Sequence, residues 1–302
     1  MTTKRKLSSI VSVSALKNEM HLRIERSKRT CYMFVALLML FSFNFVSAQD
    51  EEDIKDEIFI EDSKPFSIGA HLENMHLWHG FIVFPGVVIG TNLEYNSRNS
   101  KFTFGFWGGA SFSGSDVYNP NTGKNVSAYY KEFSIYTKYR VSEKFFIEAV
   151  SHNNYTGVEE RGDELHYWSY DKTQGYNFVD VNLGYYITPK TLLYLATIVG
   201  GGSGDYEIQA DGSLKDSWTQ YFEVNSTVWS NKNSNLSLFV GGAWSLFTDK
   251  TFYTEGAGNI VNVGATFSRD FTVVKYKIPV AVTAMWNPEQ EITVLQLDIA
   301  LF

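Results

Sequence analysis

The sequence is constrained most by twelve short segments in which apolar and polar residues alternate. Successive residues of a β-strand point to opposite faces, so this alternation predicts strands with one apolar and one polar face. The connectors between the segments alternate between short and long. An even number of strands, with short turns at one end and longer loops at the other, is typical of a barrel that spans the bacterial outer membrane. We therefore predict an all-β chain that forms a twelve-stranded antiparallel transmembrane β-barrel.

The start of the chain is typical of an export leader, which is removed from the mature protein. Basic residues precede an apolar stretch from Cys31 to Val46, and Val46-Ser47-Ala48 supplies the small residues of a cleavage site. The apolar stretch is shorter than the about 20 residues that a spanning helix needs. We predict a signal peptide over residues 1–48 rather than an uncleaved anchor. A second methionine, Met20, begins a leader of ordinary length, which makes residues 1–19 a candidate upstream extension.

Cysteine content and charge support export and argue against some partners. The single cysteine, Cys31, lies in the leader, so the mature chain has no disulfide and no lipid-bearing cysteine at its start. The leader holds eight Lys and Arg against two Asp and Glu, so the rest of the chain is more acidic than the net charge of −7. Such a chain lacks the basic surface that nucleic acid requires, and we predict no nucleic-acid partner.

The mature chain begins with a separate acidic segment. Residues 49–64 hold eight Asp and Glu, and a charge run of this kind is usually solvated. Interspersed apolar residues, including Ile54 and Phe59, leave open a short helix or a partner contact. We predict an acidic periplasmic tail over 49–64, followed by the barrel over 65–302.

The predicted strands have connectors sorted by length. They cover residues 66–78, 84–95, 101–112, 128–140, 144–156, 176–187, 191–200, 217–229, 236–247, 258–268, 271–286 and 291–302. Short turns follow the second, fourth, sixth, eighth and tenth strands. Longer connectors follow the third, fifth, seventh and ninth strands, at 113–127, 157–175, 201–216 and 248–257. Because short turns are periplasmic in such barrels, we predict that the longer loops are extracellular. The connectors after the first and eleventh strands are short for extracellular loops.

Strand parity separates an apolar outer face from a polar inner face. The outer face carries residues such as Leu93, Leu183 and Leu238, and its aromatic residues gather near the strand ends, as in interfacial girdles. The segment 192–195 is apolar on both faces. The candidate pore-lining residues on the inner face are Glu94, Glu132, Lys138, Arg140, Glu148, His152, Asp180, Glu223, Lys275 and Lys277. The same parity adds His71, Glu73 and Asp298.

The inner face has more acids than bases. Charged groups inside a barrel need partners or water, so a salt-bridged plug and a wet channel both satisfy this pattern. If the lumen is wet, its carboxylates raise the local cation concentration and favour the passage of cations. We therefore predict a weak cation preference for a channel of this kind.

Catalytic and metal-binding patterns are weak in this chain. His152 could pair with Ser134 or Ser111, but no spacing supports a catalytic arrangement. Three histidines, His71, His76 and His79, fall on opposite faces of one predicted strand and cannot all point to one ion. The glycine-rich stretch 200–204 lacks the Lys-Ser/Thr and the helix of a phosphate loop. We predict no enzyme activity, no cofactor and no metal.

Residues 66–156 resemble the TorF-like family of outer-membrane porins of Gram-negative bacteria. The resemblance is carried by Trp78-His79-Gly80, Pro85-Gly86-Val87-Val88-Ile89-Gly90, Phe104-Gly105-Phe106-Trp107-Gly108 and Glu132-Phe133-Ser134-Ile135-Tyr136. His79 stands where the family usually has Arg, and the resemblance fades after about residue 200. It implies an outer-membrane barrel and passive transport, and it transfers no functional residue.

The expected function is therefore a small-solute channel in the outer membrane of a Gram-negative bacterium. Its expected partners are outer-membrane lipid, the barrel assembly machinery, for which the terminal Phe302 is a typical signal, and small solutes. The pattern around Phe302 departs from the usual signal by one position, because the apolar residues 295, 297, 299 and 301 lie on the opposite strand face from Phe302 rather than on the same face. The pattern favours no particular solute or oligomeric state. Two alternatives stay open, a closed structural or adhesive barrel without transport and a barrel enzyme that modifies lipid.

Overall fold

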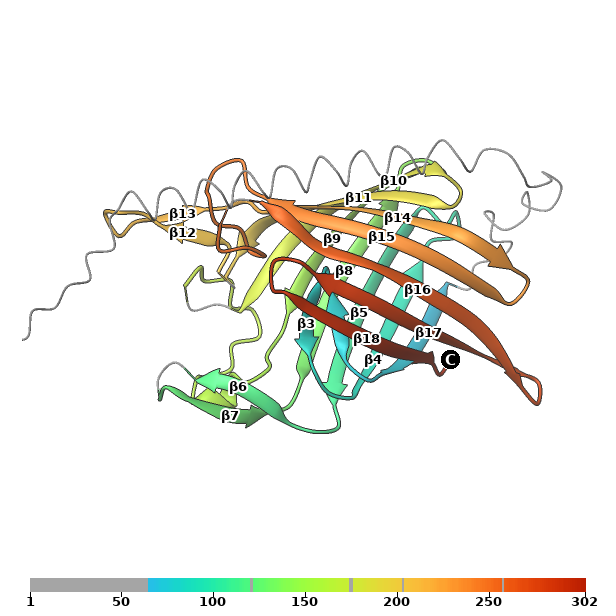
Figure 1. Cartoon of the computed structure of the whole chain (residues 1–302), viewed down its shortest axis with the longest axis horizontal. Helices are drawn as coiled ribbons and strands as arrows, with labels where there is room; N and C mark the ends of the chain where they lie inside the picture. Colours follow the sequence, from blue (N-terminus) through green and yellow to red (C-terminus); the bar gives the residue numbers. More distant parts are fainter. Residues whose placement is uncertain (1–64, 120–121, 174–175, 203, 257) are drawn as a thin grey trace, which may run out of the picture. The chain divides into compact units, whose positions relative to one another are not determined.

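A computed structural model describes residues 65–119, 122–173, 176–202, 204–256 and 258–302. The predicted signal peptide 1–48 and acidic tail 49–64 lie outside these residues. The described chain is all-β, apart from the short 3-10 helix η1 at Glu159–Arg161. Figure 1 shows the strands side by side in one continuous wall. No helix in these ranges is long and apolar enough to cross a membrane.

Twelve antiparallel strands close into a single barrel, which confirms the predicted fold class. The wall strands are β1 (Phe66–Glu73), β4 (Val88–Asn96), β5 (Phe102–Ser111), β8 (Lys131–Arg140), β9 (Phe145–Asn153), β10 (Asn177–Thr188), β11 (Thr191–Gly201), β14 (Gln220–Asn231), β15 (Ser234–Trp244), β16 (Asn259–Val273), β17 (Tyr276–Asn287) and β18 (Ile292–Ala300). Neighbours in the wall follow chain order, and β1 closes the ring against β18.

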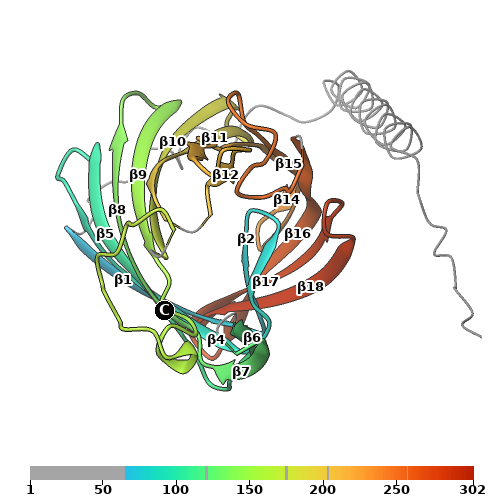
Figure 2. The ribbon, with the colours of Figure 1, turned by 90° about the vertical axis from the view of Figure 1, so that its left-hand side faces the viewer.

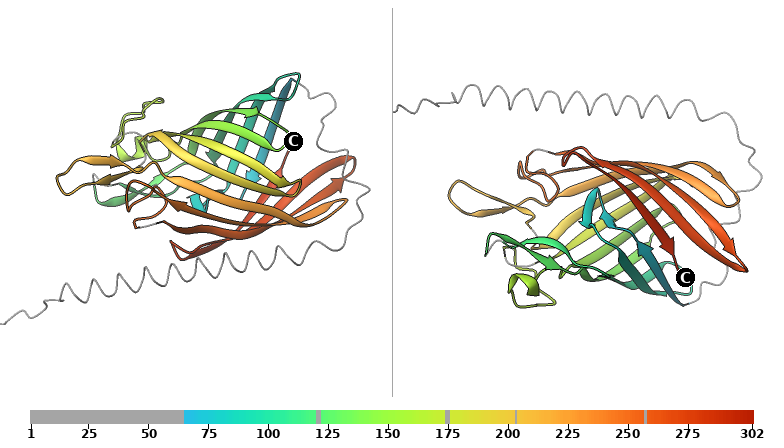
Figure 3. Two further views of the ribbon diagram at one scale, coloured as in Figure 1. Left: turned by 90° about the horizontal axis from the view of Figure 1, so that it is seen from above. Right: turned by 60° about the horizontal axis from the view of Figure 1, so that its bottom comes forward.

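Long and short connectors lie at opposite ends of the barrel, as the sequence predicts. The loop end carries two extra hairpins outside the wall, which Figure 3 shows at the end away from the C-terminus. They are β6 (Ser115–Asn119) with β7 (Lys124–Ala128) and β12 (Tyr206–Ile208) with β13 (Leu214–Asp216). The turn end has short connections between wall strands.

The predicted first strand, 66–78, is wrong beyond residue 73. The chain leaves the wall after Glu73, and β2 (His76–Trp78) pairs with β3 (Phe81–Phe84) in a hairpin of its own. The alternation continues through this segment because β2 is also a strand, so parity alone does not reveal the change of partner. The connector after β1 is therefore long, whereas the loop-end connector between β17 and β18 is short and covers residues 288–291.

The predicted turn at Arg269-Asp270 is also wrong. The β16–β17 ladder continues past these polar residues, with Phe271 opposite Ile278 and Val273 opposite Tyr276. The turn lies at Val274–Lys275, where Val274 has a φ of 61°. Polar residues near a strand end resemble a turn in sequence, although the ladder extends beyond them.

The seam between β1 and β18 is the shortest joint in the wall. It aligns three residue pairs, His71–Ala300, Leu72–Ile299 and Glu73–Asp298, whereas β1 and β4 align along the whole of β1. Above the seam, the Asn74 side chain donates to the Leu295 carbonyl and accepts from the Leu297 amide. The backbone amide of Asn74 also donates to the Leu297 carbonyl at 3.1 Å, so the backbone and the side chain of Asn74 both continue the joint.

Two apolar clusters are buried where loop-end segments pack against the inner face of the wall. One contains Tyr221, Tyr253 and Val261 with Ala196 and Ala243, and the other contains Phe84, Val88 and Tyr130. The large apolar side chains predicted to face lipid, such as Leu93 and Leu238, are exposed on the outer face.

Candidate functional site in the barrel lumen

The β2–β3 hairpin lies inside the ring of wall strands, as the view from the loop end shows (Figure 2). His79 and Gly80 both have positive φ, 45° and 89°, between the paired residues Trp78 and Phe81. Two such residues form the type I′ turn that favours glycine at the second position. The sequence Trp78-His79-Gly80 therefore encodes the tip of a hairpin.

The hairpin tip fits closely against the opposite wall. A Cβ atom added to Gly80 would lie 2.0 Å from the carbonyl oxygen of Val261 on β16. The Asn287 side chain on β17 donates a hydrogen bond to the Gly80 carbonyl at 3.0 Å, in a buried setting. Glycine is therefore required both by the backbone conformation and by the contact.

An aromatic group, which we call the tip cluster, joins this hairpin to a second loop. It contains Trp78, His79, Phe81, Phe252 and Tyr253, the last two from the β15–β16 loop. The Phe81 ring stacks on Tyr253 at 5.1 Å and 12° between planes. The His79 ring stacks on Tyr221 of β14 at 4.1 Å and 11°. Two loops and the wall thus meet inside the lumen.

His79 is held in its neutral form. Burial lowers the pKa of His79 from 6.5 to about 3, and the nearby His152 adds to the shift through charge repulsion. The Nδ1 atom of His79 lies 2.9 Å from the hydroxyl of Tyr253. The packing of the tip cluster therefore requires an uncharged imidazole.

Three predicted pore-lining carboxylates are held by hydroxyl groups rather than by cations. Glu94 accepts from the Tyr136 hydroxyl at 2.6 Å and from Ser67 at 3.2 Å. Glu132 accepts from Tyr130 at 2.6 Å and from Ser134 at 2.8 Å. Glu223 accepts from Tyr221 at 2.5 Å and from the Asn262 amide at 2.9 Å. Hydroxyl donors position these carboxylates without neutralising their charge.

Other lumen carboxylates have basic or histidine partners. Lys138 forms an ion pair with Glu148 at 2.9 Å, and its ammonium group also lies over the Phe146 ring. His152 contacts Asp180 at 3.1 Å. Near the seam, His71 contacts Asp298 at 3.2 Å and His76 contacts Glu73 at 2.9 Å. Within the described chain, Lys138–Glu148 is thus the one lysine–carboxylate ion pair in which both partners are predicted pore-lining residues.

The three other predicted bases lie at the turn end. Arg140 is the last residue of β8, and Lys277 is the second residue of β17 and lies 3.9 Å from Asp270. Lys275 lies in the β16–β17 turn, so its predicted place on a strand is wrong. The physical reason is the continued β16–β17 ladder, which moves the turn to this residue. These bases lie at the turn-end mouth of the barrel.

The catalytic and metal candidates have other partners. His152 is directed to Asp180, the Ser134 hydroxyl donates to Glu132, and the Ser111 hydroxyl donates to the Ser113 carbonyl at 2.8 Å. In the described ranges, no three His, Cys, Asp or Glu side chains are grouped so as to hold a metal ion.

Sequence reasoning missed the hairpin and the β15–β16 loop as parts of the lumen. The signal for the hairpin was present in Gly80, which follows Trp78-His79 and precedes the apolar run Phe81–Phe84. No comparable signal marks Phe252 and Tyr253, because inward folding of a loop depends on contacts distant in sequence.

Comparisons with known proteins give only distant structural likenesses. No family model matches the chain, and no curated protein matches it. A FadL homologue from Pseudomonas aeruginosa is 11% identical, with a TM-score of 0.36 over 80% of this chain and 76% of that chain. The CymD monoaromatic hydrocarbon channel is 10% identical, with a TM-score of 0.36 over 77% of this chain and 85% of that chain. LpxR from Salmonella typhimurium is 9% identical, with a TM-score of 0.34 over 78% of this chain and 99% of that chain. At these values the likenesses add nothing to the barrel geometry.

Proposed function

We propose that the chain is a porin-like channel of the bacterial outer membrane that passes small solutes and weakly prefers cations. A closed twelve-stranded barrel with an apolar outer face fits a membrane, because it leaves no sheet edge open to lipid. The β2–β3 hairpin narrows the lumen on its loop-end side. The hairpin would limit the size of the solutes that pass, and the charged side chains around it would set the preference for cations.

The observation that carries this proposal is the set of charged side chains that the barrel places on its inner face. Glu94, Glu132 and Glu223 are oriented by hydroxyl and amide donors, and none has a cationic partner among the described residues. In a packed plug these carboxyl groups would need either cationic partners or a bound proton. Water and mobile cations fulfil that need, which favours a wet lumen with excess negative charge.

Current recordings in planar lipid bilayers test the proposal. Under a KCl gradient we expect a reversal potential of the sign that indicates cation preference, and the preference should fade at high salt because the Debye length falls to about 3 Å at 1 M. Glu132→Gln keeps the acceptor for Tyr130 but removes the charge, so cation preference should fall. The matched control is Glu143→Gln in the exposed β8–β9 turn, which should leave selectivity unchanged.

Location is tested separately from conduction. The mature protein should fractionate with the outer membrane and migrate faster on gels before boiling than after it. Recovery as a soluble periplasmic protein would contradict the membrane assignment, whatever the recordings show.

A second candidate function, a closed structural or adhesive barrel, is favoured by the tip cluster. The stacking of His79 on Tyr221 and of Phe81 on Tyr253 fills part of the lumen with rings. This candidate predicts no current through the wild-type protein, even when its insertion into the bilayer is verified. Currents that appear only after the hairpin is removed would identify a closed barrel.

The finer family assignment is likewise a proposal. Its support is the resemblance of residues 66–156 to TorF-like porins, in which Trp78-His79-Gly80 forms the hairpin tip of this structure. If this chain belongs to the TorF-like family, the residue that other members have in the place of His79 should also lie at a hairpin tip in the lumen.

A further inference from the structure

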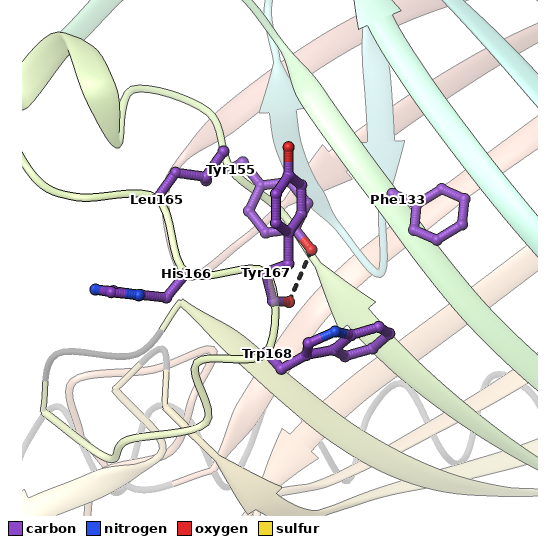
Figure 4. A pocket seen from close by; sticks show the side chains of 6 residues that line it. All are labelled: Phe133, Tyr155, Leu165, His166, Tyr167 and Trp168. Carbon is purple, nitrogen blue, oxygen red and sulfur yellow. Dashed lines mark hydrogen bonds between the residues drawn. The ribbon is translucent and has the colours of Figure 1, made fainter.

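A cavity of about 620 Å³ lies on the outer side of the barrel at the loop end, away from the lumen residues. It is lined by Phe133, Tyr155, Leu165, His166, Tyr167 and Trp168. Phe133 comes from β8, Tyr155 lies two residues after the end of β9, and the other four come from the loop between β9 and β10. Figure 4 shows the two tyrosines in the centre, with Phe133 on one side of them, Leu165 and His166 on the other, and Trp168 below.

The loop that covers this cavity is held by hydrogen bonds. The Tyr155 hydroxyl donates to the Tyr167 carbonyl at 2.9 Å, drawn as the dashed line in Figure 4. The Tyr176 hydroxyl accepts from the His166 amide at 2.6 Å and lies 2.8 Å from the His166 carbonyl. Asn177 donates to the Tyr167 carbonyl at 2.9 Å. These bonds hold the backbone of His166 and Tyr167, so the loop that covers the cavity is anchored at these two residues.

The exposed side chains of the cavity are large and apolar. Trp168 is 61% exposed, Tyr167 58% and Phe133 43%. Phe133 lies on the outer face of β8, because its neighbour Glu132 points into the lumen and contacts Tyr130. In a membrane barrel this face contacts lipid, and aromatic residues at the strand ends lie at the interface. The cavity therefore opens at the boundary between lipid and water.

An aromatic row leads from the cavity down the lipid-facing wall. Phe133 stacks on Phe106 at 5.6 Å, and Phe106 meets Phe104 edge to face at 5.1 Å. Gly108 is the register partner of Phe133 and adds no side chain beside it. The cavity is thus continuous with a strip of lipid-facing surface that runs along β5 and β8.

The charges near the cavity do not suit an anionic headgroup. The lining contains no Lys or Arg, and the cations of the neighbouring segment already have carboxylate partners. Lys131 contacts Glu159 at 2.9 Å and Glu160 at 3.3 Å, and Arg161 contacts Asp163 at 3.6 Å. His166 lies 3.7 Å from Glu164. A ligand here would be recognised through apolar contacts.

We propose that this cavity binds one acyl chain of an outer-leaflet membrane lipid, with the chain extending along Phe133, Phe106 and Phe104. The site recognises the chain and is indifferent to the headgroup. The proposal requires that the barrel lies in a membrane and does not depend on whether the lumen conducts.

Quenching of tryptophan fluorescence by bromine tests this site. The purified barrel in detergent is titrated with phosphatidylcholine that carries brominated acyl chains, at low mole fractions of lipid. We expect quenching that saturates, because a site fills, and we expect Trp168→Phe to remove the saturable component. The matched control is Trp286→Phe, because Trp286 is also exposed near the loop end, on β17. This control should keep the saturable component.

A second variant tests the strip without altering the reporter. Phe133→Ala should weaken the saturable quenching of Trp168 at least tenfold, whereas Phe267→Ala, an exposed outward residue of β16, should not. Brominated phosphatidylglycerol should bind within a few-fold of phosphatidylcholine. The proposal is overturned by quenching that rises only in proportion to lipid mole fraction, by equal losses in Trp168→Phe and Trp286→Phe, or by a strong preference for one headgroup.

Discussion

Replacing Gly80 by alanine should release the β2–β3 hairpin from the lumen wall. The residue has a φ of 89°, and an alanine there costs about 1–2 kcal/mol. The new Cβ would lie 2.0 Å from the Val261 oxygen, so the tip must move away from β16. That movement breaks the buried bond from Asn287 to the Gly80 carbonyl, which costs about 1–3 kcal/mol.

Together these effects weaken docking of the hairpin by roughly 2–5 kcal/mol. The ratio of docked to undocked hairpin should therefore fall by about thirty-fold to several thousand-fold, since 1.4 kcal/mol corresponds to a factor of ten. Because the hairpin narrows the lumen, we expect Gly80→Ala to raise the single-channel conductance and to increase brief transitions between current levels.

The matched control is Gly212→Ala in the β12–β13 hairpin. Gly212 also has a positive φ, 81°, but a Cβ atom there would meet nothing within 4 Å. The Gly212→Ala variant should carry a similar local backbone strain, should fold, and should leave the single-channel conductance unchanged. If the two variants gave the same conductance as the wild type, the hairpin would not be the constriction. If both raised it equally, the effect would not arise from contact with Val261.

Three further predictions concern pH, a single hydroxyl and sidedness. Because burial lowers the pKa of His79 from 6.5 to about 3, its contribution to docking is complete above pH 6.5 and is lost at about 1.4 kcal/mol per pH unit as the pH falls toward 3. Acid should therefore raise conductance in the wild type, and a pH-independent conductance would contradict this. The other polar groups around the His79 ring are Tyr194, Tyr253, the Tyr221–Glu223 pair and the His152–Asp180 pair. The His79→Asn variant should remove only the part of the pH dependence that arises from His79. Tyr253→Phe should weaken docking by about 0.5–1.5 kcal/mol, visible as a smaller conductance change than that of Gly80→Ala. Protease added to intact cells should cut the loops 113–127, 157–175 and 201–216 and spare the turns at 96–100 and 230–235, and the reverse pattern would show inverted topology.

The wall of the barrel could be predicted from sequence because its constraints are local. Alternation identifies a strand and its faces, as for Leu93 outside and Glu94 inside, and the closed barrel confirms the strand number. Alternation does not locate the ends of the strands, because a polar pair such as Arg269-Asp270 looks like a turn although the ladder extends to Val273.

The lumen could be predicted only in part. Parity placed Glu132 and Glu148 on the polar face, but it could not give their partners, the Tyr130 hydroxyl and Lys138. The departure of His76–Trp78 from the wall leaves the alternation intact, so nothing in the period-two pattern reports it. Contacts of the hairpin with Tyr253 join segments separated by 174 positions, and single-sequence periodicity carries no such information.

The short seam between β1 and β18 has a consequence for the order in which the barrel forms. Its partners, such as His71 and Ala300, are the most distant in sequence of all the wall pairs, so their joining has the largest loop-closure cost and should come last. Besides its three aligned pairs, the joint has backbone hydrogen bonds from Leu301 to the Ala70 carbonyl, from Ala70 to the Phe302 carbonyl and from Asn74 to the Leu297 carbonyl. The Asn74 amide, which bonds to Leu295 and Leu297 as a peptide group would, extends this joint on its loop-end side. In a bilayer, where an open strand edge is costly, these backbone bonds and the Asn74 side chain together close the ring.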